Sequence, residues 1–134
     1  MRRRGLYALG LAAAVAAVVL GSGHLRSATP TVKPTGWFAA RVTYDPNPPV
    51  ALRHVEVRIR LVARGRPVRA RRLRVELFMT DMSMPLTRVA VRRTGRGVYR
   101  GRTVFVMGGP WAARIQVWTR TRRGTVEVPV TVDP

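Results

Sequence analysis

The chain has 134 residues, and its 25 Lys and Arg residues against 6 Asp and Glu residues give a formal net charge of +19. This length allows one small domain with a single hydrophobic core. The absence of cysteine excludes disulfides, thiolate zinc sites, iron–sulfur clusters and covalent c-type haem attachment.

The N-terminal segment has the pattern of an export signal. Its sequence, MRRRGLYALGLAAAVAAVVLGSGHLRS, places three arginines before an uncharged stretch from Gly5 to Gly23. A helix from Leu6 to Leu20 would span about 22 Å, which is short of the roughly 30 Å hydrocarbon core of a bilayer. Residues 1–27 are therefore expected to be either a signal-anchor transmembrane helix or a cleaved signal peptide. In both cases the rest of the chain would lie on the extracytoplasmic side, at the cell membrane or secreted.

A linker and a β domain are expected to follow. Residues 28–36, ATPTVKPTG, contain two prolines and three threonines and have the composition of an extended linker. Apolar and polar residues then alternate with period two through residues 37–134, as in HVEVRIRLV. We expect seven short strands and an immunoglobulin-like antiparallel β-sandwich without a long helix. The expected strands are 37–44, 53–62, 71–79, 87–92, 98–107, 111–119 and 125–132.

The strand order assigns each connection to one end of this sandwich. We call the end that holds Trp37 the near end and the opposite end the far end. If consecutive strands run antiparallel, the connections alternate between the two ends. The far end is then expected to hold the loops 45–52, 80–86 and 108–110, and the near end the turns 63–70, 93–97 and 120–124.

The methionines gather near the far end. The stretch FMTDMSMP contains Met79, Met82 and Met84, while Met107 precedes GGPW and His54 opens the second expected strand. Thioethers are soft ligands that select Cu(I), and imidazole binds copper in either oxidation state. These five residues are the predicted copper site. The alternative is that the methionines only fill gaps in the core, which suits Met79 and Met107 best.

No motif predicts an enzyme. Ser83, Asp81 and His54 have the residue types of a hydrolytic triad, but no Gly-x-Ser-x-Gly turn frames the serine. No phosphate loop, zinc motif or calcium loop is found, so no catalytic residue and no cofactor other than copper is predicted. Three acidic residues sit among arginines at outward strand positions, where exposed cross-strand ion pairs are expected: Glu56, Glu76 and Glu127.

Three aromatic residues have predicted positions. Trp111 is expected to close one end of the core, and Trp118 alternates outward from the same strand. Tyr99 lies where a glycine-rich turn enters a strand, which predicts a tyrosine-corner type of hydrogen bond from its hydroxyl to nearby backbone. Because the domain is expected to be exported, no nucleic acid partner is predicted.

The basic residues are almost all arginine and are unevenly spread. The far-end loops contain no arginine or lysine, but they do contain Asp45 and Asp81. The arginines reflect either compositional bias or recognition of phosphate groups. We expect the near end to face anionic lipid, unless the charge serves only solubility. Its arginines are Arg64, Arg66, Arg69, Arg92, Arg93, Arg96, Arg120, Arg122 and Arg123.

The segment from about Gly65 to Val117 resembles the YtkA-like domain family. The resemblance implies an exported or membrane-anchored immunoglobulin-like domain with no established enzyme activity. FixH-like proteins, which have a similar layout, imply a role in copper supply, although their N-terminal pattern is not found here. The leading hypothesis is copper handling, and the alternative is a module that docks a partner protein through its far-end loops. The matching positions are Pro67, Val68, Ala70, Val75, Met79, Met82, Met84, Gly95, Gly97, Tyr99, Gly101, Met107, Gly109 and Trp111.

Overall fold

The computed structural model describes residues 36–134. The signal or anchor segment expected at residues 1–27 lies outside these residues, as does nearly all of the linker expected at 28–36. Within the described part of the chain, no helix is long and apolar enough to cross a membrane.

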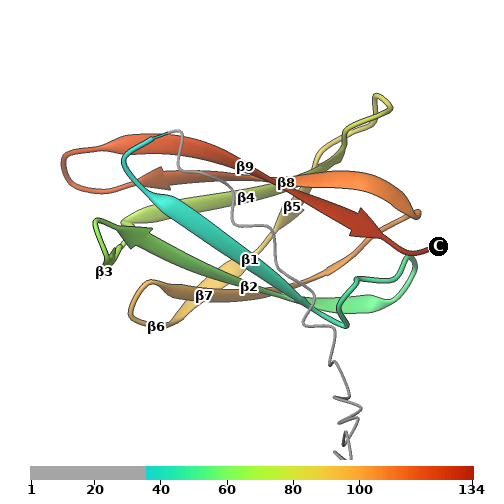
Figure 1. The fold of residues 1–134 in the computed structure, drawn as a ribbon, viewed down its shortest axis with the longest axis horizontal. Coiled ribbons are helices and arrows are strands. Elements are labelled where there is room, and N and C mark those ends of the chain that lie inside the picture. The colour runs from blue at the N-terminus through green and yellow to red at the C-terminus, as the bar shows by residue number, and fades with distance from the viewer. Residues whose placement is uncertain (1–35) are drawn as a thin grey trace, which may run out of the picture.

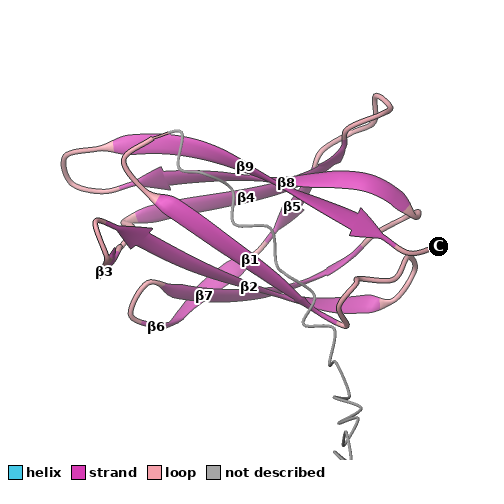
Figure 2. Ribbon diagram, viewed as in Figure 1, coloured by secondary structure: helices cyan, strands magenta, loops and turns pink. Residues whose placement is uncertain are grey.

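Residues 36–134 form nine β-strands and contain no helix (Figure 2). Alternating burial along the longer strands shows why they form: in β2, for example, every second side chain is buried between the sheets. The strands are β1 (Ala39–Asp45), β2 (His54–Ala63), β3 (Arg66–Pro67), β4 (Arg72–Met79), β5 (Thr87–Val89), β6 (Val91–Gly95), β7 (Val98–Val104), β8 (Gly109–Trp118) and β9 (Arg123–Val132).

The strands pair into two antiparallel sheets that face each other (Figure 1). The first sheet has the order β1-β2-β7-β6, with the short β3 beside β2, and the second has the order β5-β4-β8-β9. All the ladders between neighbouring strands are antiparallel. This division of consecutive strands matches the two sheets of an immunoglobulin fold, so the predicted all-β sandwich is confirmed.

The expected number of seven strands is wrong, because residues 36–134 form nine. The short β3 lies within the expected turn 63–70, and one expected strand is divided in two. The stretch 87–92 was predicted as a single strand, but the structure splits it into β5, which pairs with β4, and β6, which pairs with β7. The chain changes sheets at Ala90. Alternation continues through this point, because Val89 is buried and Ala90 is exposed, so the pattern gives no sign of a break.

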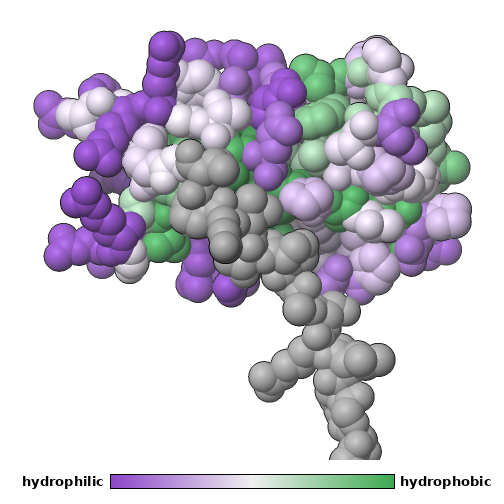
Figure 3. Space-filling view, turned by 45° about the horizontal axis from the view of Figure 1, so that its top comes forward, coloured by the Kyte–Doolittle hydropathy of each residue, from purple (hydrophilic) through white to green (hydrophobic). Residues whose placement is uncertain are grey.

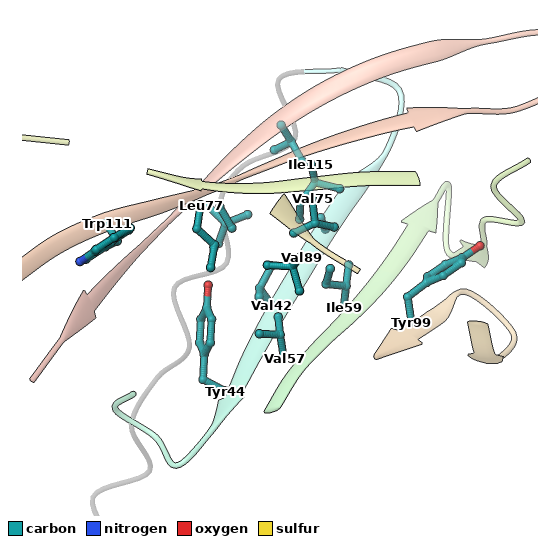
Figure 4. Packing of buried hydrophobic residues seen from close by; sticks show 14 of the residues in the cluster. Val42, Tyr44, Val57, Ile59, Val75, Leu77, Val89, Tyr99, Trp111 and Ile115 are labelled. Atoms are coloured by element: carbon teal, nitrogen blue, oxygen red, sulfur yellow. The ribbon is translucent and has the colours of Figure 1, made fainter. Parts of the chain in front are cut away.

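The core fills the space between the two sheets with side chains from residues 38–132 (Figure 4). Phe105 packs edge-on against Trp111 at 5.2 Å between ring centroids and against Tyr44 at 6.0 Å. A chain that begins at residue 28 keeps all of these side chains and is therefore expected to fold without the preceding segment.

Tyr44 carries a buried hydroxyl group. Figure 4 shows this hydroxyl pointing toward Leu77 of the opposite sheet, and it has no hydrogen-bond partner among residues 36–134. Burial raises the pKa of Tyr44 above its ordinary value, because the charged phenolate would be poorly solvated there.

Backbone hydrogen bonds confirm the assignment of the loops to the two ends. At the far end, Leu52 donates to the Phe105 carbonyl at 2.8 Å, and Thr80 donates to the Pro110 carbonyl at 3.0 Å. At the near end, Leu61 donates to the Gly97 carbonyl at 2.8 Å. The connections therefore alternate between the ends as the strand order predicted.

The Tyr99 hydroxyl binds backbone, as predicted, but not nearby backbone. It accepts a hydrogen bond from the Ala70 N–H at 2.9 Å and donates to the Val68 carbonyl at 3.5 Å. These partners lie 29 and 31 residues earlier in the chain. Tyr99 therefore holds the connection that crosses from the first sheet to the second, and the expectation of a local tyrosine corner is wrong.

Tyr99→Phe is expected to lower the free energy of unfolding by about 1 kcal/mol, because it leaves the half-buried Ala70 N–H without its acceptor. Tyr44→Phe is the matched control. It removes a hydroxyl that has no partner within residues 36–134, so it should leave stability unchanged or raise it. Urea denaturation followed by circular dichroism would compare the two. Equal losses from both substitutions would contradict the assignment.

Candidate functional site

The loop of residues 80–86, which we call the methionine loop, projects beyond the body of the domain (Figure 1). It joins β4 and β5, two strands of the second sheet. The backbone N–H of Thr80 and its hydroxyl both donate to the Pro110 carbonyl, at 3.0 and 3.4 Å. The base of the methionine loop is thus tied to the start of β8, next to Trp111.

The four methionines of the described chain divide into two inner and two outer side chains. Met79 is 6% exposed and belongs to the core, as its inward strand position predicted, and Met84 is half-buried against the core. Met82 is 50% exposed and Met107 is 40% exposed. Only the outer pair, with the accessible edge of Met84, offers thioethers to a ligand from solvent.

Trp111 connects the segments that carry these methionines. It is 1% exposed, which confirms that it closes the core. Its backbone pairs with Met79 of β4, and its indole N–H donates to the Met107 carbonyl at 3.1 Å. The structure therefore brings the segments of Met79 and Met107 together at the far end.

Gly109 lies two residues before this tryptophan, at the start of β8. Its φ of +125° is a conformation that side chains disfavour. A Cβ atom at this position would also lie 3.0 Å from the methyl group of Met79. A glycine is therefore needed where the start of β8 passes over the buried methionine.

His54 lies apart from the buried methionine. It begins β2 in the first sheet, is exposed, and shares the outer face of that sheet with Glu56. Met79, in contrast, points into the core from the second sheet. The alternation in HVEVRIRLV already placed His54 on the outward side, so the structure does not gather all five predicted ligands on one surface.

Within residues 36–134, no three His, Cys, Asp or Glu side chains come together in a way that could hold a metal ion. Copper binding by the methionine thioethers stays a prediction. Ser83 and Asp81 are exposed in the methionine loop, while His54 belongs to the other sheet.

An apolar surface surrounds the outer methionines. All of the large hydrophobic side chains that are exposed within residues 36–134 lie at the far end, and we call them the far-end apolar patch: Leu52, Met82, Leu86, Val104, Val106 and Met107. Figure 3 shows the same trend, with strongly hydrophilic surface on the left and most of the hydrophobic surface on the right, interspersed there with polar residues. Exposed apolar side chains that concentrate at one end of a domain make that end a candidate interaction site.

Sequence reasoning missed four members of this patch. Val104 and Val106 occupy outward positions in TVFVM, where a polar residue is usual, and this signal was available. Leu86 follows Pro85 in the methionine loop. Leu52 is 76% exposed and has a φ of +59°, a conformation uncommon for a bulky residue. Nothing in the sequence indicated that backbone conformation.

The near end is basic, as predicted. The Arg122 guanidinium lies 5.9 Å from the Trp37 ring, and the Trp37 indole N–H donates to the Arg123 carbonyl at 3.0 Å. Arg92 is the exception among the near-end arginines, because β6 places it beside Arg100 on the outer face of the first sheet. Trp118 faces outward from the second sheet, with the Arg72 guanidinium 5.0 Å from its ring. Lipid binding by the near end stays a prediction.

The two sheets, the methionine loop and the far-end apolar patch define an immunoglobulin-like β-sandwich domain with one basic end and one apolar end. The model of the YtkA-like family matches residues 33–116, which is more than half of the chain, and the chain belongs to this family. No curated protein matches the sequence.

Among solved structures, the chain is similar to a DUF4785 family protein from Legionella pneumophila, with a TM-score of 0.54 and 11% identity. The match covers 74% of this chain but only 29% of that protein, so it shows the fold alone. The Lin-41 filamin domain matches with a TM-score of 0.48 and 12% identity, over 69% of this chain and 90% of that domain.

Proposed function

We propose that this YtkA-like domain is a non-enzymatic binding domain on the extracytoplasmic side of the cell membrane, and that its far end captures Cu(I) through Met82, Met84 and Met107. The observation that carries the proposal is the exposure of Met82 and Met107. Methionine is normally a core residue, as Met79 is here. Two thioethers that face solvent at one end of the domain are available to a soft cation.

The local charge also supports cation capture. A protein with a formal charge of +19 repels cations at most of its surface. The far-end loops 45–52, 80–86 and 108–110 contain no arginine or lysine, and Asp81 lies next to Met82. A copper ion would therefore meet the least positive end of the molecule at the place where the thioethers are exposed.

Met82→Leu with Met84→Leu in the chain that begins at residue 28 is expected to weaken Cu(I) binding by about tenfold or more, because leucine keeps the apolar volume and removes the ligand sulfur. Met107→Leu should act in the same direction. An anaerobic competition titration against a chromophoric Cu(I) chelator would measure the affinity.

Two control variants limit the interpretation. Met79→Leu changes a buried thioether, and His54→Gln changes an imidazole on the other sheet, so neither should weaken Cu(I) binding by more than about threefold. A parent domain that takes up no Cu(I), or a double variant that binds as tightly as the parent, would remove the copper proposal.

The far-end apolar patch favours a second candidate, in which the same end docks a partner protein. The double variant Leu52→Ser, Leu86→Ser separates the two functions, because it removes apolar surface and leaves every sulfur in place. Under the copper proposal this variant retains its Cu(I) affinity. Under the docking proposal this variant no longer binds the partner protein. The double variant Met82→Leu, Met84→Leu still binds it, because leucine keeps the apolar surface.

A further inference from the structure

The outer face of the first sheet carries arginines that stand directly opposite one another. Arg58 of β2 is in register with Arg100 of β7, and Arg100 is in register with Arg92 of β6. One row of the sheet therefore holds arginine on three neighbouring strands. On the next row toward the near end, Arg41 of β1 pairs with Arg60 of β2.

Of the described residues, only two carboxylates lie on this face, Asp45 and Glu56, and they are paired with each other in register toward its far end. Like charges directly opposite each other on neighbouring strands are unfavourable, because their Cβ atoms are only about 4.5–5.5 Å apart. The one ion pair within residues 36–134 on this face joins Arg100 to Glu56 at 3.3 Å. Arg41, Arg58 and Arg92 form no ion pair with any described residue.

The second sheet shows that this arrangement is not a simple result of arginine-rich composition. The comparable row there runs Arg88, Glu76, Arg114, Glu127 across its four strands, with alternating charge. Arg114 contacts Glu127 at 3.1 Å and Arg88 contacts Glu76 at 3.8 Å. The same composition thus gives a neutralised row on one sheet and an unneutralised row on the other.

Shallow grooves lie between the arginines of the first sheet. One, of about 210 Å³, is lined by Arg41, Thr43, Arg58 and Arg60. The other groove has a volume of about 420 Å³, and the charged residues that line it are Glu56, Arg92, Arg100 and Arg102. The first groove has no acidic lining residue, and its guanidinium groups can bind phosphate through paired N–H donors.

We propose that the outer face of the first sheet binds the phosphate headgroups of an anionic lipid bilayer, so that the domain lies on its side against the membrane. The spread of the arginines supports this occupant. They repeat across strands that are about 4.8 Å apart and along strands at every second residue. Such an array suits a surface that presents many phosphates rather than one small ligand. The methionine loop, which joins strands of the second sheet, then faces away from the lipid.

This inference is independent of copper binding, and it differs from the sequence-based expectation that the near-end turns alone face the lipid. Two triple variants with the same change in charge distinguish the two surfaces. Arg41→Gln, Arg58→Gln, Arg92→Gln changes the first sheet and leaves the Arg100–Glu56 pair intact. Arg69→Gln, Arg96→Gln, Arg120→Gln changes exposed near-end arginines.

Co-sedimentation of the chain that begins at residue 28 would use vesicles of phosphatidylcholine alone and vesicles with about 30% phosphatidylglycerol. At low salt the parent is expected to bind only the anionic vesicles. The first-sheet triple variant should bind them about tenfold or more weakly, and the near-end triple variant within about threefold of the parent. Circular dichroism melts would verify that both variants are folded.

A direct test of orientation uses the lack of cysteine in the chain. Thr43→Cys places a single label on the outer face of the first sheet, and Thr125→Cys places one on the outer face of the second. Anionic vesicles should shield the fluorescent label at residue 43 from acrylamide quenching and leave the label at residue 125 accessible. Shielding at residue 125 instead, or equal loss of vesicle binding in both triple variants, would overturn the proposal. Failure to bind anionic vesicles, together with arginine-dependent binding of polyglutamate, would also overturn it and assign the face to an acidic protein.

Discussion

Replacement of Trp111 with alanine is expected to lower the free energy of unfolding by about 3–5 kcal/mol, the range for deleting a large buried aromatic side chain. The indole is almost fully buried and packs against Phe105. Alanine would leave a cavity there, and it would remove the N–H that binds the Met107 carbonyl. Because small domains are stable by only about 5–15 kcal/mol, this loss would be a large part of the total.

Trp118→Ala is the matched control, because it changes the same residue type on the same strand but on the outward side. It removes the stacking of Arg72 on a ring that is only half-buried, so a loss of about 1 kcal/mol, well below that from Trp111→Ala, is expected. Urea denaturation followed by far-ultraviolet circular dichroism would measure both values independently of tryptophan fluorescence. A loss from Trp118→Ala as large as that from Trp111→Ala would contradict the assignment of Trp111 to the core.

Gly101→Ala is expected to destabilise the domain by about 1–3 kcal/mol, although it adds only one methyl group. A Cβ atom on Gly101 would lie 2.4 Å from the Ala90 carbonyl oxygen and 3.0 Å from Val89 and Val91 side chains. The obstructing atom is a backbone oxygen at the point where the chain changes sheets, so rotation of a side chain cannot relieve the clash. The change should push β6 away from β7.

Gly95→Ala is the control for this substitution. Its nearest new contact would be the Val98 Cβ atom at 3.8 Å, which is an ordinary packing distance. Alanine there should leave the stability of the domain unchanged or raise it slightly, because it restricts the unfolded chain. Thermal melts would compare the melting temperatures of the two variants with that of the parent. Gly101→Ala with the melting temperature of the parent would show that β7 does not lie as close to the Ala90 carbonyl as described.

The sequence predicted the sandwich well because alternation directly reports which side chains face a core. HVEVRIRLV coincides with β2, and Trp111 lies inside as expected. The same local pattern could not show where the chain changes sheets, because Ala90 keeps the alternation intact. Nor could it show that the Tyr99 hydroxyl reaches a connection about thirty residues earlier, since that contact depends on how the sheets face each other.

The candidate surfaces were predictable only in part, because they too depend on which distant segments of the chain become neighbours. The methionine stretch was visible in the sequence, but the division into buried Met79 and exposed Met82 required the path of the methionine loop. The arginine row depends on which strands are neighbours. Arg58 and Arg100 lie far apart in the sequence, and only the pairing of β2 with β7 places them opposite each other.

The change of sheets at Ala90 also bears on how the domain loses its structure. Because β5 and β6 are separated by one residue and belong to opposite sheets, neither sheet can detach while the other keeps all its strands. The connection held by Tyr99 adds a second tie of this kind. The two sheets should therefore unfold together in a single cooperative transition, and the slowest-exchanging amide protons of β2 and β8 should report the same opening free energy.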